Sequence, residues 1–257
     1  MTTLFISHGA PTLAMEPGET GRMLSELGTS LPRPTSILVI SAHWDTKAAQ
    51  VSFAEKPETI HDFGGFPPEM YKMQYPANGA PGLAKQVIDV LEQANIPITT
   101  SSDRGLDHGA WVPLMLLYPQ ADIPVTQLSI QSHLGPAEHY QLGQAISPLQ
   151  DDGVMILCSG AVTHNLSDFF SMNREALSLD YVPQFANWIA NKIEHNDTDA
   201  LLDYRKIAPG GVRAHPHEDH LSPLFVALGA AKDRENVKRY APETTFGILA
   251  MDTYVWD

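Results

Sequence analysis

The chain has 257 residues, of which 43% are hydrophobic, and a formal net charge of -14 from 30 acidic and 16 basic residues. This length and composition predict a single domain over residues 1–257 with a substantial core. The acidic balance argues against nucleic acids and anionic membranes as partners, because their phosphates bind lysine and arginine.

The single cysteine, Cys158, excludes an internal disulfide and favours a reducing compartment. No apolar run reaches the length of a membrane span. The N-terminus enters a strand-like run without a basic segment and a cleavage site. We therefore expect a cytoplasmic protein, and the sequence leaves its oligomeric state open.

Apolar runs along the chain predict the strands of a central sheet, and amphipathic stretches between them predict helices. The runs are nearly continuous, which is typical of strands covered on both faces, so we expect an α/β fold with a mostly parallel or mixed sheet flanked by helices. The predicted strands are Leu4–Ile6, Ile37–Ile40, Ile123–Ser129, Val154–Cys158 and Phe246–Met251. The predicted helices follow apolar stripes at helical spacing in 84–91, 111–118, 140–146, 185–193 and 221–228.

Three histidines, His8, His43 and His164, each follow one of the first, second and fourth predicted strands. Ligands of open α/β sheets bind outside the carboxyl ends of the strands, so these side chains are expected to converge there. Each of them alone is more often a hydrogen-bonded turn residue, but three in the same position favour a transition-metal site of neutral imidazoles. Small neighbours such as Gly9 and Gly160 are expected to leave room for a ligand beside the backbone.

A fourth histidine, His220, precedes the last predicted helix. It lies four residues before Leu224 and eight before Leu228, which places it on the inward stripe at the first turn. The helix dipole disfavours cations at this end, so the imidazole is expected to be neutral, the form that binds metals.

The residues just before His220 offer rival ligands. His215 and His217 complete an H-x-H-x-x-H spacing that could bind zinc by itself, although no local pattern matches a zinc finger or an H-E-x-x-H helix. We expect Glu218 and Asp219 to cap the helix.

Other catalytic patterns are missing from the sequence. There is no G-x-S-x-G elbow, no Walker glycine loop with a lysine, and no dinucleotide fingerprint after the first strand. A long aromatic loop with two glycines, from Ile60 to Pro68, suits a cover over a cleft. The segment Asp107–Gly109 precedes the helix that contains Trp111.

Five short blocks, in order, resemble the class III (LigB-type) extradiol ring-cleavage dioxygenases, and most closely their 4,5-DOPA extradiol dioxygenase branch. Together with the histidine before the last helix, they cover most of the chain, and their order and spacing make the set specific. The blocks are Ser7–Pro11, Ser41–Trp44, Ile60–Pro67, Gly105–Trp111 and Ser159–Leu166.

The resemblance implies a non-haem iron(II) enzyme that opens a catechol-type, DOPA-like ring with O₂, and that can hold zinc in the same site. His8 and His43 match metal ligands, and His220 matches the third. His164 matches an acid/base beside the metal and is a candidate fourth ligand. His108 matches a histidine that contacts the substrate or supports the ligands.

The third ligand stays open at this point. The branch carries Pro-Glu before the last histidine, whereas this chain carries Glu218–Asp219. In the wider family the third ligand is a glutamate, so Glu218 or Asp219 could replace His220.

The function also has alternatives that use the same histidines. One is a zinc-dependent hydrolase that activates water, and another is a metal-binding protein without catalysis. If the chain is a dioxygenase, we expect Trp44, Phe63 and Phe66 to wall the substrate pocket near His108.

Overall fold

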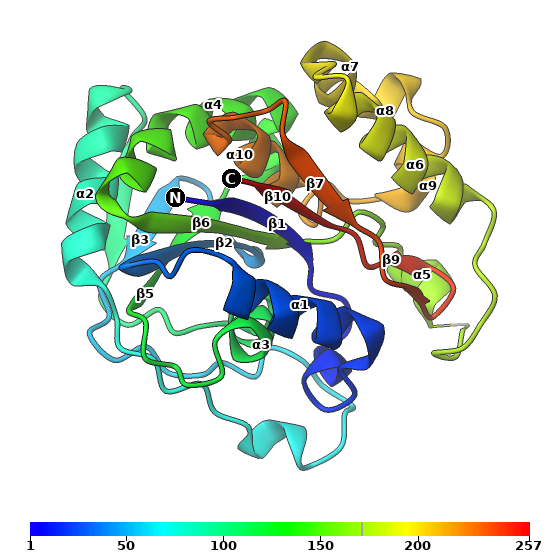
Figure 1. Cartoon of the computed structure of the whole chain (residues 1–257), viewed down its shortest axis with the longest axis horizontal. Coiled ribbons are helices and arrows are strands. Elements are labelled where there is room, and N and C mark those ends of the chain that lie inside the picture. Colours follow the sequence, from blue (N-terminus) through cyan, green and yellow to red (C-terminus); the bar gives the residue numbers. More distant parts are fainter. Residues whose placement is uncertain (171) are drawn as a thin grey trace.

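The computed structural model describes residues 1–170 and 172–257, and a mixed sheet runs through its centre (Figure 1). Within these residues the sheet has eight strands. In spatial order they are β4 (Ile98–Ser101), β3 (Ala49–Ser52), β5 (Val125–Ile130), β2 (Ser36–Asp45), β6 (Val154–Gly160), β1 (Thr3–Ser7), β10 (Thr253–Trp256) and β7 (Val237–Tyr240).

The four central strands β5, β2, β6 and β1 are parallel, so their carboxyl ends meet at one edge. Antiparallel pairs of β3 with β5 and of β10 with β1 extend the sheet on both sides. β1, β5 and β6 are buried along their whole length, which explains their continuous apolar sequence. Cys158 lies inside β6, opposite Phe5 of β1 and Ile40 of β2, and burial raises the pKa of its thiol.

Helices cover both faces of the sheet (Figure 1). One layer contains α2 (Pro81–Gln93), α4 (Pro136–Ile146) and α10 (Ser222–Ala230), and the other contains α1 (Gly18–Ser30) and α3 (His108–Leu117). Between β6 and α10 the chain forms α5 (Leu166–Phe169), α6 (Tyr181–Glu194), α7 (Thr198–Leu202), α8 (Tyr204–Ile207) and α9 (Gly211–Ala214). Short 3₁₀ turns lie at Pro11–Ala14, Met70–Lys72, Ser132–Leu134 and Ser147–Asp152. Within the described part of the chain, every helix is too short or too polar to cross a bilayer.

The predicted α/β class and mixed sheet are confirmed, and four of the predicted strands lie in β1, β2, β5 and β6. The fifth prediction, Phe246–Met251, is wrong as a strand of this sheet. Phe246 and Gly247 have φ angles of 52° and 62°, which break an extended chain. The segment instead forms β9 (Leu249–Ala250), which pairs with β8 (Thr244–Thr245), and the sheet strand is the later β10.

The predicted helices are confirmed as α2, α3, α4, α6 and α10. The sequence analysis did not predict α1, which packs against α3 through Thr20, Gly21, Leu24 and Leu27 on one helical face; two of these four residues are not apolar.

α4 and α10 cross so closely that each needs a glycine at the contact. A Cβ added to Gly229 would lie 2.0 Å from the carbonyl oxygen of Tyr140. A Cβ added to Gly143 would lie 2.1 Å from the carbonyl oxygen of Val226. Both obstacles are backbone atoms, so a side chain could fit only if the helices moved apart.

Replacement of Gly229 by alanine tests this contact. We expect Gly229→Ala to lower the free energy of unfolding by about 1–3 kcal/mol, the usual cost of overpacking, despite alanine's better helix propensity. Urea unfolding of the purified protein measures this value. Gly82→Ala in α2, where no atom lies within 4 Å of the added Cβ, is the matched control and should not destabilise the protein. Equal stability of the two variants would contradict a tight crossing.

Candidate metal centre

Histidines from three separate segments meet at the carboxyl edge of the parallel strands. His8 directly follows β1, and its backbone N–H donates to the carbonyl of Gly160 at 3.0 Å. His43 lies near the carboxyl end of β2. His220 was expected at the first turn of the last helix, but it lies in the turn before α10, two residues ahead of its first residue Ser222. The sheet edge thus brings together residues that are far apart in the sequence.

The three rings converge on one point. Their centroids lie 5.0 Å apart for His8 and His43, 5.4 Å for His8 and His220, and 4.9 Å for His43 and His220. Each ring offers a nitrogen, and these three nitrogens all lie within 4.8 Å of one another. Nε2 of His8 and Nε2 of His43 are 3.1 Å apart.

The other ring nitrogen of each of these histidines faces a polar partner. Nδ1 of His8 lies 3.0 Å from Oγ of Ser159, and Nδ1 of His43 lies 3.2 Å from Oδ2 of Asp62. Nδ1 of His220 lies 3.0 Å from Oδ2 of its neighbour Asp219. A carboxylate beside Nδ1 favours the proton on that atom and leaves the lone pair on Nε2.

This arrangement fits a transition-metal ion. Two Nε2 lone pairs at 3.1 Å repel each other unless a cation or a proton lies between them. Ligands held about 2 Å from one metal stand about 3 Å apart, which matches that spacing. Both ring nitrogens of His220 are buried without a hydrogen-bond partner among the described residues, since the Asp219 contact at Nδ1 lacks hydrogen-bond geometry. A cation at the meeting point would satisfy all three nitrogens.

Burial keeps these imidazoles neutral. It lowers the pKa of His8 and His220 well below the usual value, and neighbouring histidines lower them further. Burial also lowers the pKa of His43 to about 4, with His108 adding to the effect. Neutral imidazole is the form that binds metals, so the site is ready for a cation at neutral pH.

His164 lies against this group and not within it. Its ring stacks on that of His220, with centroids 3.5 Å apart and planes 3° from parallel. Among the described residues, the converging nitrogen set contains His8, His43 and His220 but not His164. Burial lowers the pKa of His164 to about 4, so it is a neutral base at pH 7.

His108 closes another side of the centre, at the first position of α3. Its ring centroid lies 4.0 Å from that of His43 and 5.4 Å from that of His8. Its backbone N–H and its Nδ1 both contact Oδ1 of Asp62, at 2.9 and 3.0 Å. His108 therefore lies beside the three converging histidines.

The rival ligands before His220 lie elsewhere. Nε2 of the buried His215 contacts the carbonyl of Val162 at 2.7 Å, and the exposed His217 lines an open cleft of about 400 Å³. Oε1 of Glu218 lies 3.3 Å from Nε of Arg205. The H-x-H-x-x-H segment does not form a local metal site within the described structure.

The expected helix caps are also absent. No side chain caps α10 at its first residue within the described structure, so the prediction that Glu218 and Asp219 cap it is wrong. The backbone carbonyl of Glu218 instead accepts from the N–H groups of Leu221 and Ser222, at 3.2 and 3.0 Å. This turn leaves the Asp219 side chain free to lie beside His220.

The small residues near the centre admit protein atoms and not a ligand, contrary to expectation. A Cβ on Gly160 would lie 2.2 Å from the carbonyl oxygen of His220, which accepts from Ala161 N–H at 2.8 Å. Gly160 therefore lets the His220 turn approach β6. A Cβ on Gly9 would lie 2.7 Å from Cε of Met251.

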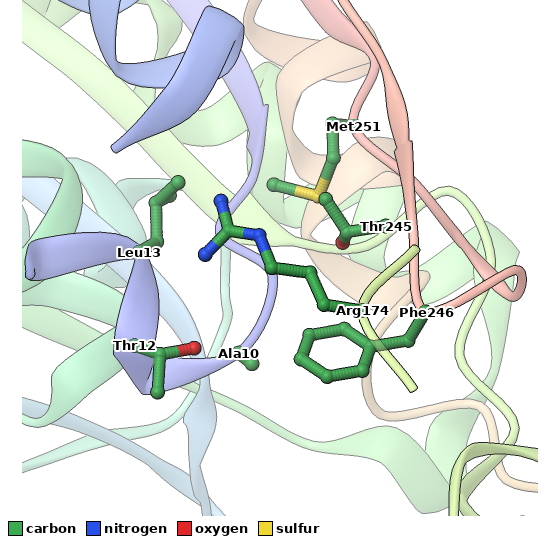
Figure 2. Close-up of a pocket in the computed structure, with 7 residues that line it drawn as sticks. All are labelled: Ala10, Thr12, Leu13, Arg174, Thr245, Phe246 and Met251. Atoms are coloured by element: carbon green, nitrogen blue, oxygen red, sulfur yellow. The ribbon is translucent and has the colours of Figure 1, made fainter. Parts of the chain in front are cut away.

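Figure 2 shows a small pocket beside this end of β1, with the guanidinium of Arg174 near Met251 and Leu13. Arg174 donates two hydrogen bonds to Glu16. Its Nη1 donates to the side-chain oxygen Oε2 at 2.5 Å, and its Nη2 donates to the backbone carbonyl at 2.8 Å. The cavity of about 10 Å³ holds about one water molecule. It is therefore too small to take an aromatic ring in this conformation.

Of the expected pocket aromatics, Phe63 and Phe66 lie on the side of His108. The Phe63 ring centroid is 5.7 Å from that of His108 and 5.3 Å from that of Phe66. Trp44 has no ring contact with the site histidines among the described residues. It lies against the guanidinium of Arg104, 5.2 Å from the ring centroid.

Sequence reasoning assigned no role to two carboxylates that support the centre, Asp62 and Asp107. Asp107 is fully buried and accepts from Ser41 Oγ at 2.6 Å, Arg104 Nη2 at 2.7 Å and Gln127 Nε2 at 2.9 Å. Arg104 Nη2 also donates to the carbonyl of His43, so this network holds the end of β2. A signal existed for both residues, since each stands within one of the quoted sequence blocks.

Comparison with known proteins agrees with this geometry. The family model described as the catalytic LigB subunit of aromatic ring-opening dioxygenase matches residues 2–250. A protein of Beta vulgaris named 4,5-DOPA dioxygenase extradiol is 39% identical, over 98% of this chain and 95% of its own length. A protein of the same name from Escherichia coli K12 is 37% identical, over 98% of this chain and 93% of its own length.

A crystal structure of an uncharacterized protein from Escherichia coli K12 shares the fold, with a TM-score of 0.82 and 30% identity over 100% of both chains. The family match spans almost the whole sequence, and the histidine centre stands at the sheet edge that the fold provides. The chain therefore belongs to the LigB family of aromatic ring-opening dioxygenases and is an extradiol ring-cleaving enzyme.

Proposed function

We propose that this enzyme, as a single catalytic domain over residues 1–257, opens a DOPA-like catechol ring with O₂ at a metal held by His8, His43 and His220. The observation that carries the proposal is the convergence of three ring nitrogens within 4.8 Å of one another. The names of the relatives supply the substrate class, a catechol that carries an amino-acid side chain.

We propose iron(II) as the metal of the active form and zinc as an ion that the same site accepts. Imidazole nitrogens suit both metals, so the donor set alone does not choose between them. When bound, iron(II) supplies the Lewis acidity that lowers the pKa of a catechol hydroxyl and the redox chemistry that lets O₂ react. Between His220, Glu218 and Asp219, the convergence supports His220 as the third ligand.

The protein's own residues would handle the protons and exclude water. His164 is neutral and adjacent to His220, so it can take a proton from the second catechol hydroxyl and later return one. We also keep His164 as a candidate fourth ligand, which would require its ring to move from the stacked position on His220. His108 would contact the substrate, and Phe63 and Phe66 would shield that side from bulk water.

We propose that the enzyme works in the cytoplasm on small molecules and binds neither nucleic acid nor membranes. The support is a single cysteine, Cys158, which is buried as a free thiol, together with the net charge of -14.

The ligand set can be tested by metal analysis of alanine variants. His8→Ala, His43→Ala and His220→Ala should each lose a direct bond to the metal. Metal content after equal loading should therefore fall strongly in each, measured by elemental analysis. His217→Ala, which removes the exposed rival, is the control and should keep wild-type content. Full metal content in His220→Ala would move the third ligand to Glu218 or Asp219.

The role of His164 can be separated from metal binding. In His164→Gln we expect the iron content to stay near the wild-type level while turnover falls by about 10²–10⁴-fold, the usual effect of losing an acid/base group. Elemental analysis and steady-state kinetics on the same preparation measure the two quantities. Ring cleavage at a nearly normal rate in this variant would contradict the acid/base role.

The reaction itself can be tested after anaerobic loading with iron(II). We expect one O₂ consumed for each catechol lost, and a yellow ring-opened semialdehyde acid as product, because extradiol cleavage breaks the bond beside the two hydroxyl carbons. An oxygen electrode and mass spectrometry record both. Hydrolysis by a zinc-loaded sample without oxygen uptake would favour the hydrolase alternative. The absence of turnover with either metal would favour a binding protein.

A further inference from the structure

One carboxylate, that of Asp62, connects the aromatic loop to two histidines of the centre. Its Oδ1 lies 2.9 Å from the backbone nitrogen of His108 and 3.0 Å from Nδ1 of that ring. Its Oδ2 lies 3.2 Å from Nδ1 of His43. This side chain therefore accepts two hydrogen bonds from His108, the first residue of α3, and its second oxygen faces Nδ1 of His43 in β2 at ion-pair distance.

We propose that Asp62 is a positioning residue that fixes the tautomer and the ring orientation of both His43 and His108. The inference rests on the proposed metal site, since it concerns the ligand His43. An ionised carboxylate only accepts hydrogen bonds, so each Nδ1 that faces it carries the proton. Nε2 of each ring then keeps its lone pair. In His43 that lone pair is directed to the metal, and in His108 it can accept a hydrogen bond from a substrate hydroxyl.

The loop that carries Asp62 is fastened on both sides of it. Before Asp62, the N–H of Ile60 donates to the carbonyl of Leu106 at 2.7 Å, and Trp111 Nε1 donates to the carbonyl of Ile60 at 3.0 Å. After it, the Phe63 ring packs edge-on against His108. Because these contacts hold the loop, the carboxylate is presented to the histidines at little further cost in conformational entropy.

The alternative is that Asp62 is itself a metal ligand. His43, Asp62 and His108 do form a second group whose candidate atoms lie within 4.8 Å of one another. However, both rings face Asp62 with Nδ1, whereas Nε2 of His43 is the atom that meets His8. Oδ1 of Asp62 already accepts two hydrogen bonds from His108 and Oδ2 faces the His43 ring, so Asp62 is better placed to orient these rings than to bind the metal.

Zinc affinity distinguishes these roles without any measurement of ring cleavage. Competition with a chromophoric chelator gives the dissociation constant for Zn²⁺ in the full-length protein. In Asp62→Asn, which keeps the shape but loses the charge and one acceptor oxygen, we expect affinity to fall about 10–100-fold. The control Glu69→Gln removes one charge from an exposed position of the same connection between β3 and α2, and this variant should bind Zn²⁺ like the wild type.

The outcomes separate the inference from the function on which it rests. Wild-type affinity in Asp62→Asn would overturn the positioning role. A loss as complete as that in His43→Ala would also overturn it, because it would make Asp62 a ligand. If His43→Ala itself binds Zn²⁺ normally, the proposed metal site fails, and the inference fails with it.

A second measurement needs no variant and so does not depend on whether Asp62→Asn folds. Nitrogen-15 spectra of the histidine-labelled, zinc-loaded wild-type protein report which ring nitrogen carries the proton. We expect Nδ1–H in both His43 and His108. A proton on Nε2 of His108 would show that Asp62 does not set its tautomer and would overturn the inference.

Discussion

The centre depends on keeping several buried imidazoles neutral while their lone pairs point at one place. Burial lowers the pKa of His8, His43 and His220, so none of them carries a charge that would repel a metal. Neutral rings can still face a neighbour with either nitrogen. In His43 the carboxylate of Asp62 beside Nδ1 favours the proton on that atom and leaves the Nε2 lone pair facing His8. Buried acceptors without partners cost about 1–3 kcal/mol each, so a bound cation should also stabilise the folded chain.

The fold positions the three histidines on two kinds of element, parallel strands and a turn outside the sheet. The parallel strands β1 and β2 carry His8 and His43 to the same edge, as strand direction requires. His220 arrives from a turn outside the sheet, and the backbone of β6 accepts that turn only because position 160 has no side chain. The buried Asp107 network then holds the end of β2, and Asp62 holds the ring of His43. The backbone and the ring of one ligand therefore depend on different carboxylates.

Much of this arrangement could be predicted from the sequence, because it follows from local patterns. Apolar runs mark the central strands, and the position of His8 after such a run marks the edge where ligands gather. What failed depends on backbone conformation or on contacts between distant segments. The left-handed angles at Phe246 and Gly247 leave no trace in hydrophobicity. The sequence shows that residue 160 is a glycine, but only the folded chain shows that the backbone of His220 fills the space beside it. The role of Asp62 likewise requires the loop to fold back onto α3.

The single cysteine gives this molecule a built-in reporter of local opening. Cys158 is fully buried in β6, between the two strands that carry His8 and His43. Burial raises the pKa of its thiol, and the nucleophilic thiolate is therefore suppressed while the sheet is closed. A thiol reagent can react only after β6 separates from its neighbours, so the labelling rate reports how often the sheet opens locally around β6. The local stability of the strands that carry His8 and His43 can thus be followed in the unmodified chain, independently of catalysis.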